Sequence, residues 1–233
     1  MILIDTVYQR VLALANKEQR GYITPQEFNL FADQAQLEIL EQYFYDINQA
    51  NRLIGNDTEY SDMLNLLDEK LGVLKNNASI PNAVGNNLLP TDLYKLGSVY
   101  IEGNEVEPVN FNEYITLNKS PLTRPTYNLN GVKTPVYVMN RDRITIYWSG
   151  SCPSCSASIT YIKKPATPYW GYVVIDEKAM YNPSTTTNFE LHASEEAELV
   201  NRILGAAGIT MKQPDLTQAA AQMEGTKQAS EKQ

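Results

Sequence analysis

The side chains that most often carry chemistry are scarce in this chain of 233 residues, which holds one histidine and two cysteines. Cys152 and Cys155 form a Cys-x-x-Cys motif, but a structural zinc ion needs four ligands, and only His192 is left to supply a third nitrogen or sulfur. A thioredoxin-type redox motif would need a helix directly after a strand, whereas serine and glycine surround these cysteines between two expected strands. We therefore interpret Cys152 and Cys155 as reduced thiols in a loop, without a metal.

The short motifs of common catalytic sites are also missing. The sequence contains no Gly-x-Ser-x-Gly, no Walker phosphate loop and no His-Glu-x-x-His. Acidic pairs such as Glu195-Glu196 lie on amphipathic segments, where charges normally face water. The sequence therefore predicts a protein that is not an enzyme, with no catalytic residue and no cofactor. A cell-wall-degrading enzyme is the alternative of this class, and a zymogram would detect it.

Residues 16–27 have the frame of an EF-hand calcium loop, with Gly21 at the sixth position and Glu27 at the twelfth. The ligand positions fit poorly, because Asn16 replaces the leading acid and Arg20 brings a cation where an acid is expected. A helix start explains the same residues without a metal. A calcium-binding EF-hand-like module is nevertheless the alternative function of a different class, which a calorimetric calcium titration would test.

Helical spacing of apolar residues predicts three N-terminal helices, over residues 4–16, 24–48 and 60–72. In the second of these, Thr24 can cap the helix, Pro25 suits its first position, and Glu27 completes a capping box. Ile23 and Phe28 are spaced as a hydrophobic staple. The first helix has an apolar stripe made of Ile4, Val7, Val11 and Leu14. Two helices joined by a short loop predict an antiparallel helical hairpin.

The middle of the chain changes composition, since ten of the twelve prolines lie between Pro81 and Pro183 and ten of the fifteen tyrosines between Tyr94 and Tyr181. Residues 76–87 are interpreted as a linker. Short strands rich in Tyr, Val and Ile are expected at residues 94–101, 106–111, 135–139, 143–148, 156–162 and 171–175. Proline-broken runs of this kind indicate an antiparallel β domain.

A last long helix is expected to begin at Ser194, as its N-cap, and to end at Gly208 in a left-handed cap. A short helix over residues 215–224 follows. Because isolated helices under about 12–15 residues are marginal in water, this tail would need a partner to hold it. The residues assigned to this tail docking are Pro214, Leu216, Ala220 and Met223.

Charge and hydropathy exclude several classes of partner. Lys and Arg number 19 against 27 Asp and Glu, which gives a net charge of −8. An acidic chain is a poor match for DNA phosphates or anionic membranes over a broad surface. No apolar run approaches the roughly 18–20 residues that span a bilayer, and the N-terminus has no signal-peptide core. We expect a protein that folds in a cytoplasm.

Five segments resemble the virion neck proteins, or head-to-tail adaptors, of crAss-like and related short-tailed bacteriophages. The resemblance extends from about Val7 to Met223 and depends on the order and extent of the segments. They are Asn16-Lys-Glu-Gln-Arg-Gly-Tyr-Ile-Thr-Pro-Gln-Glu-Phe-Asn-Leu-Phe-Ala-Asp-Gln-Ala-Gln-Leu-Glu38, Leu89-Pro-Thr-Asp-Leu-Tyr-Lys-Leu96, Asn118-Lys-Ser-Pro-Leu-Thr-Arg-Pro125, Tyr161-Ile-Lys-Lys-Pro165 with Trp170, and Phe189-Glu-Leu-His-Ala-Ser-Glu-Glu196.

This resemblance implies a homo-oligomeric ring, usually a dodecamer, below the portal protein, or a later ring of the neck or tail. Downstream neck or tail proteins would be its other partners, and genomic DNA would pass through an axial channel only as cargo. Its location would be the neck of the virion, after assembly in the host bacterial cytoplasm.

The expected fold is α+β, with an N-terminal helical bundle over residues 1–75 and an antiparallel β domain over 76–190. A C-terminal helix over 191–210 would pack on the bundle, and residues 211–233 would form the docking tail.

Overall fold

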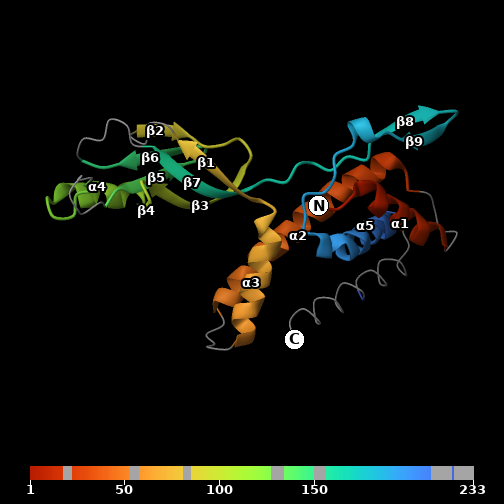
Figure 1. The fold of residues 1–233 in the computed structure, drawn as a ribbon, viewed down its shortest axis with the longest axis horizontal. Helices are drawn as coiled ribbons and strands as arrows, with labels where there is room; N and C mark the ends of the chain where they lie inside the picture. The colour runs from red at the N-terminus through yellow and green to blue at the C-terminus, as the bar shows by residue number, and fades with distance from the viewer. Residues whose placement is uncertain are drawn as a thin grey trace. The chain divides into compact units, whose positions relative to one another are not determined.

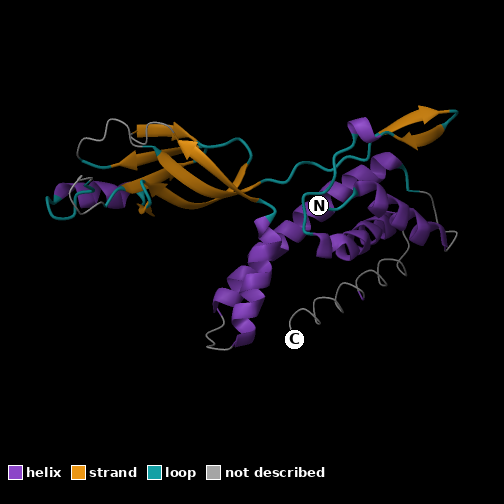
Figure 2. Cartoon of the chain, in the orientation of Figure 1, coloured by secondary structure: helices purple, strands orange, loops and turns teal. Residues whose placement is uncertain are grey.

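A computed structural model describes residues 1–17, 23–52, 58–80, 85–126, 134–149, 156–210 and 222. The chain divides into two compact units (Figure 1). Residues Met1–Leu74 and Pro165–Gln233 form the first, here called the helical unit, and Lys75–Lys164 form the second, the β unit. Helices in one and a mostly antiparallel sheet in the other (Figure 2) confirm the expected α+β class.

Four long helices build the helical unit: α1 (Ile4–Lys17), α2 (Pro25–Arg52), α3 (Thr58–Gly72) and α5 (Glu196–Thr210). Helix α2 contacts both α3 and α5, and α5 also packs on α1. The apolar stripe expected on α1 is largely correct, since Ile4, Val7 and Val11 are fully buried. It is wrong at Leu14, which is 45% exposed, because the stripe continues on the buried Ala15 instead.

The start of α2 has the expected capping box. Glu27 Oε2 accepts the N–H of Thr24 at 3.0 Å and its hydroxyl at 2.7 Å, and Thr24 Oγ1 accepts the N–H of Glu27 at 3.3 Å. Ile23 and Phe28, on either side of this turn, are buried. These bonds satisfy N–H groups that the first turn of a helix leaves unpaired.

The start of α5 differs from the expectation. His192 is the N-cap of a 3-10 turn, η2 (Ala193–Glu195), and its side chain accepts the N–H of Ser194. Ser194 is therefore not the N-cap, and α5 begins two residues later at Glu196. The expected end at Gly208 is also wrong, since the helix continues to Thr210. Glycine permits a left-handed cap but does not require one.

After the β unit the chain returns to the helical unit and forms a two-stranded hairpin, β8 (Tyr172–Ile175) with β9 (Lys178–Tyr181), and then a 3-10 turn, η1 (Pro183–Thr185). The β unit ends at Lys164, whereas the sequence places the end of the β domain at residue 190. The difference arises because strand-like composition does not reveal which core a strand joins. Segment 165–190 belongs with the helices.

Polar side chains of α2 hold this returning segment. Gln36, which is fully buried, donates to Ala166 O at 2.9 Å and accepts the N–H of Glu190 at 3.0 Å. Asn29 accepts the N–H of Trp170 at 2.7 Å and donates to its carbonyl at 3.4 Å. These side-chain amides form hydrogen bonds with backbone N–H and C=O groups of the returning segment, which would otherwise need other partners.

In the described part of the β unit, seven strands form one sheet in the order β1-β7-β3-β4-β5-β6-β2. Their bounds are β1 Lys75–Ile80, β2 Gly85–Leu88, β3 Leu93–Ile101, β4 Asn104–Pro108, β5 Val136–Asn140, β6 Arg143–Tyr147 and β7 Ala157–Lys163. All pairs are antiparallel except β4 with β5. Val99, Ile144 and Ile159 lie fully buried in the core of this unit.

Three elements of the β unit differ from the sequence-based expectation. The expected linker at residues 76–87 is wrong, because β1 and β2 form the two edges of the sheet there. Edge strands can carry polar side chains, since much of their surface faces water. The strand expected at 106–111 ends at Pro108, and a helix that the sequence did not predict, α4 (Phe111–Lys119), follows it.

Candidate functional site

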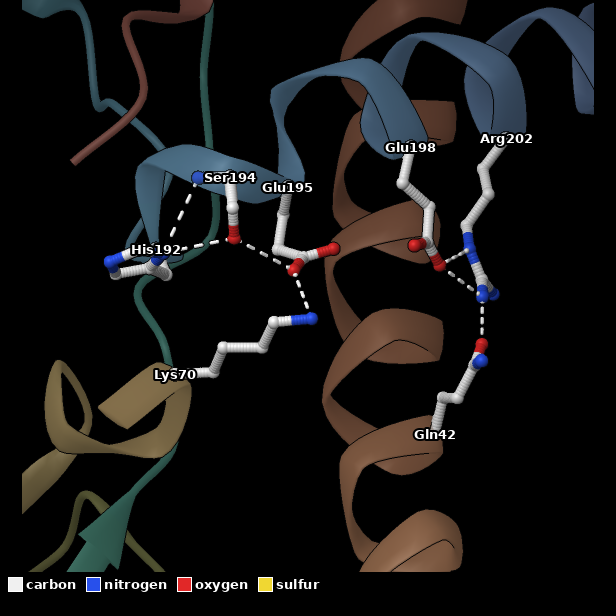
Figure 3. A network of polar contacts seen from close by, with 7 residues as sticks. All are labelled: Gln42, Lys70, His192, Ser194, Glu195, Glu198 and Arg202. Atoms are coloured by element: carbon white, nitrogen blue, oxygen red, sulfur yellow. Dashed lines mark hydrogen bonds and ion pairs between the residues drawn. The ribbon is translucent and has the colours of Figure 1, made fainter. Parts of the chain in front are cut away.

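A group of polar side chains lies where α5 begins, next to α3 (Figure 3). His192 Nδ1 lies 2.9 Å from Ser194 Oγ, and that hydroxyl donates to Glu195 Oε1 at 3.0 Å. The same oxygen of Glu195 forms an ion pair with Lys70 Nζ at 2.9 Å, and the side chains of Lys70 and Glu195 are 7% and 1% exposed. A histidine, a serine and a glutamate, the residue types of a hydrolase triad, thus stand in a row.

The order of these contacts does not match a triad. In a hydrolase the carboxylate contacts the histidine and leaves the serine oxygen directed at the substrate. Here the carboxylate of Glu195 contacts Ser194, and His192 Nδ1 accepts the N–H of Ser194 at 3.3 Å. The group therefore fits a structural joint, which fastens the start of α5 to α3 through Lys70.

A second cluster joins α5 to α2 (Figure 3). The guanidinium of Arg202 donates to Glu198 Oε1 at 2.9 Å through Nε and at 2.6 Å through Nη2, and it also donates to Gln42. A longer ion pair of 3.6 Å connects it with Glu38. The side chain of Arg202 is 10% exposed, so these carboxylates pair a nearly buried charge. This cluster also has a packing role.

No group of three or more His, Cys, Asp or Glu residues in the described ranges is placed to hold a metal ion. Glu27, the last ligand position of the calcium-loop frame, accepts two hydrogen bonds from Thr24. These bonds, from the hydroxyl first and the N–H second, lower the pKa of the Glu27 carboxyl below its ordinary value. Cys152 and Cys155 lie outside the described residues. None of the helices described is long and apolar enough to span a membrane.

Among the described residues of the helical unit, the β8–β9 hairpin, residues 172–181, exposes several large apolar side chains, and we call it the arm. Five of its side chains are at least 40% exposed: Val173 (48%), Val174 (63%), Ile175 (56%), Met180 (55%) and Tyr181 (40%). Isolated two-stranded hairpins are marginal in water, and exposed apolar patches mark interaction sites. The arm is thus a candidate protein-binding element.

The base of the arm is firmly anchored. Trp170 is 3% exposed, its Nε1–H donates to Asp5 Oδ1 at 2.9 Å, and its ring packs on Tyr8 with centroids 4.4 Å apart. The rings of Tyr172 and Tyr181, the first and last residues of the arm, lie 6.0 and 5.7 Å from that of Trp170. The arm therefore presents apolar side chains from a fixed support.

The β unit presents a different apolar surface on α4. None of the residues of this helix is buried, and Phe111 and Ile115 are 55% and 41% exposed. Leu122, shortly after the helix, is 96% exposed. The ring of Tyr114, 6.4 Å from that of Phe111, stacks on Tyr147 at 3.9 Å, beside a pocket of about 210 Å³ that Arg124, Trp148 and Ser149 help to line. A nine-residue helix without a buried residue is a second candidate protein-binding element.

The sequence-based choice of binding residues is not tested by the structure, because Pro214, Leu216, Ala220 and Met223 lie outside the described residues. The arm and the α4 surface are not among the residues chosen from the sequence. The arm has a sequence signal, since two apolar runs flank Asp176-Glu177 as in a two-residue hairpin. No sequence signal indicates that the arm is exposed, because only the fold shows which strands lack a partner.

No protein-family model matches the chain, and no curated protein matches it.

Proposed function

We propose that this protein is a structural subunit of a virion ring, a head-to-tail connector in the neck of a short-tailed bacteriophage. Identical copies would close into a ring below the portal protein, bind a downstream neck or tail protein on the opposite side, and leave an axial channel for DNA. The role is geometric and needs no catalytic residue or cofactor. The order of the five sequence segments from Asn16 to Glu196 motivates the identity of the ring.

The observation that carries the proposal is the presence of two unlike exposed apolar elements, the arm and α4. A closed ring requires that each subunit use two different complementary surfaces, one for each neighbour, and a connector needs further surfaces for the layers above and below. The arm is a strand ribbon with Val173, Ile175 and Met180 exposed on one face. The surface of α4 is helical and aromatic. Such elements serve assembly better than they serve a monomer, which would gain nothing by exposing them.

The charge of the chain suits a conduit for DNA. A net charge of −8 gives the protein little attraction for phosphates, so a channel built from this subunit would not retain the passing genome. The polar joints of the helical unit suit the same role. Lys70 pairs with Glu195 and fastens the start of α5 to α3, and Arg202 binds Gln42 and Glu38 and fastens α5 to α2. A ring wall under load benefits from such fixed helix contacts.

The test is co-expression with the portal protein of the same genome, followed by native mass spectrometry and electron microscopy. We expect rings with a central hole, bound to portal particles and matched to the symmetry of the portal. The protein without portal is a control, because a connector can depend on the portal as its template. A protein that stays monomeric with portal at every concentration tested contradicts the proposal.

A further inference from the structure

The arm has two open edges in addition to its exposed side chains. Strand β8 pairs with β9, from Tyr172 opposite Tyr181 to Ile175 opposite Lys178. Within the described residues neither strand pairs with any other, so the outer backbone N–H and C=O groups of both strands face away from the hairpin. Such edges are templates for pairing with a further strand. The arm therefore offers hydrogen bonds as well as apolar surface.

The strands of the arm carry few of the features that normally prevent edge pairing, although each is only four residues long. Proteins protect an edge with proline, a bulge or inward-pointing charges, lysine above all. Residues 172–175 contain no charge and no proline, and the only charged residue of β9 is Lys178. The register of the two strands is continuous over all four pairs, without a bulge. The turn is tight as well, since Asp176 and Glu177 have φ values of 49° and 62°, the left-handed pair that suits a two-residue hairpin.

The charges at the tip of the arm are complementary to those of another arm. If β9 of one arm lies antiparallel to β8 of the next, both tips point the same way. The Lys178 that begins one β9 then lies beside the Asp176-Glu177 turn that follows the neighbouring β8. An ammonium would thus meet two carboxylates at each contact. Two β8 strands, or two β9 strands, paired with each other would not bring these charges together in this way.

The exposed area of the arm is large for its length. From their exposed fractions, the five apolar side chains leave on the order of 500 Å² accessible, whereas a stable interface takes about 800 Å² from each partner. Because these side chains lie on both faces of the hairpin, pairing through an edge covers only part of this area. The remainder of the interface would come from the bodies of the two copies that the arms bring together.

We infer that the arm joins this protein to a second copy of itself, by antiparallel pairing of β9 of one arm with β8 of the next. Each arm has one edge of each kind, so the pairing is head to tail and repeats from copy to copy until the ring closes. Closure leaves no free edge. This inference rests on the proposed ring, and it specifies which element forms the contact between subunits.

Cysteine cross-linking tests the pairing directly. The background carries Cys152→Ser and Cys155→Ser, and one preparation then receives Val174→Cys and another Ala179→Cys. These two positions lie opposite each other within one hairpin, on the same face. With the tips of adjacent arms level, as the proposed contact of Lys178 with Asp176-Glu177 requires, they also lie opposite each other between β8 and β9 of adjacent arms. After mild oxidation of the mixture, with and without portal, we expect disulfide-linked dimers of one copy of each kind, several-fold in excess over dimers of either kind alone. Assembly without mixed dimers, or equal cross-linking in each preparation alone, overturns the inference.

A second experiment separates the arm from the proposed function. Val173→Glu with Met180→Glu places two carboxylates on the exposed apolar face, and we expect ring assembly on the portal to weaken about tenfold or more while the melting temperature stays within a few degrees of the wild type. Leu30→Glu is the matched control, since Leu30 is 68% exposed on α2, outside the arm. Rings that form equally well from both variants refute the role of the arm and leave the connector proposal intact. A wild-type chain that forms no ring with portal refutes the connector, and mixed dimers in concentrated protein alone would still support arm pairing.

Discussion

Thr24 and Glu27 fix where α2 begins through three mutual hydrogen bonds. Thr24→Ala removes the hydroxyl that caps the helix and should lower the free energy of unfolding by about 1 kcal/mol. Thr24→Ser keeps the hydroxyl and is the matched control. Urea denaturation followed by circular dichroism measures both. Equal midpoints for the alanine and serine variants would show that the cap adds nothing.

The same pair predicts a pH dependence. Hydrogen bonds from Thr24 lower the pKa of the Glu27 carboxyl in the folded protein below the ordinary value of 4.5. A lowered folded-state pKa gives a stabilisation that is present above the unfolded pKa and is lost as the pH falls through the folded one. The wild type should therefore be more stable than Glu27→Gln at neutral pH, and the difference should shrink as the pH falls below 4.5. The difference should be small because the side chain is exposed.

Added calcium should leave the melting temperatures of the wild type and of Glu27→Gln unchanged. A calcium-dependent shift in the wild type that disappears in Glu27→Gln would instead establish the EF-hand-like alternative. Thermal denaturation with added calcium and with a chelator measures it. The reason for the expectation is that Thr24 already donates two hydrogen bonds to the carboxylate that would have to bind the ion.

Gly171 lies at the base of the arm, where there is no room for a side chain. A Cβ added there would lie 2.7 Å from Asn182 O and would also collide with Thr185 Oγ1. Gly171→Ala should therefore destabilise the protein by about 1–3 kcal/mol through overpacking. Gly72→Ala is the control, because an added Cβ at Gly72 meets nothing within 4 Å. Thermal denaturation of both variants is the measurement, and equal melting temperatures would contradict the packing argument.

At the scale of elements, the joint between α3 and α5 predicts a strong effect of charge removal. Lys70→Met leaves the carboxylate of Glu195 buried without its cation and should cost about 3–5 kcal/mol of unfolding free energy. Lys70→Met combined with Glu195→Leu should recover most of that loss, because no buried charge remains unpaired.

The control for this joint is the ion pair of Arg10 with Glu196, where Arg10 is 56% exposed. Arg10→Met should change stability by less than about 1 kcal/mol, since water screens an exposed pair. Guanidinium denaturation of the four proteins measures all of these changes. A loss in the double variant as large as in Lys70→Met would show that packing, and not charge, holds the joint.

Elements with local signals were predictable from the sequence. Helix α2 was predictable, since its capping box and its hydrophobic staple lie within a few neighbouring residues. Strand β1 was not, because its residues Lys-Asn-Asn-Ala-Ser-Ile pair as a sheet edge and carry few apolar side chains. The contact of Asn29 with Trp170 joins residues 141 positions apart, and no local pattern contains it. Segment 165–190 was for this reason assigned to the β domain, and the exposure of the arm was not foreseen.

At the scale of the whole molecule, the two units have different tasks in the proposed ring. The helical unit combines internal ion pairs with a protruding arm, so it can meet its neighbours without deforming. The β unit carries α4 on a closed core and offers a surface of another kind. A connector has to bind identical copies of itself and also different proteins above and below the ring. Each of the two units has its own exposed apolar element for such a contact.

The tail beyond Met211 gives the last prediction. Leu216 and Met223 are its large apolar residues before Glu224, and a helix this short is marginal without a partner. Deleting residues 213–233 should leave the melting temperature nearly unchanged and should weaken binding to the portal, because the tail would dock in a groove of that partner. Deleting only residues 225–233 is the control, since that piece has no apolar side chain larger than alanine and should bind normally. Co-sedimentation with portal particles compares the three proteins, and full binding by the longer deletion would show that docking residues other than Pro214, Leu216, Ala220 and Met223 tether the subunit.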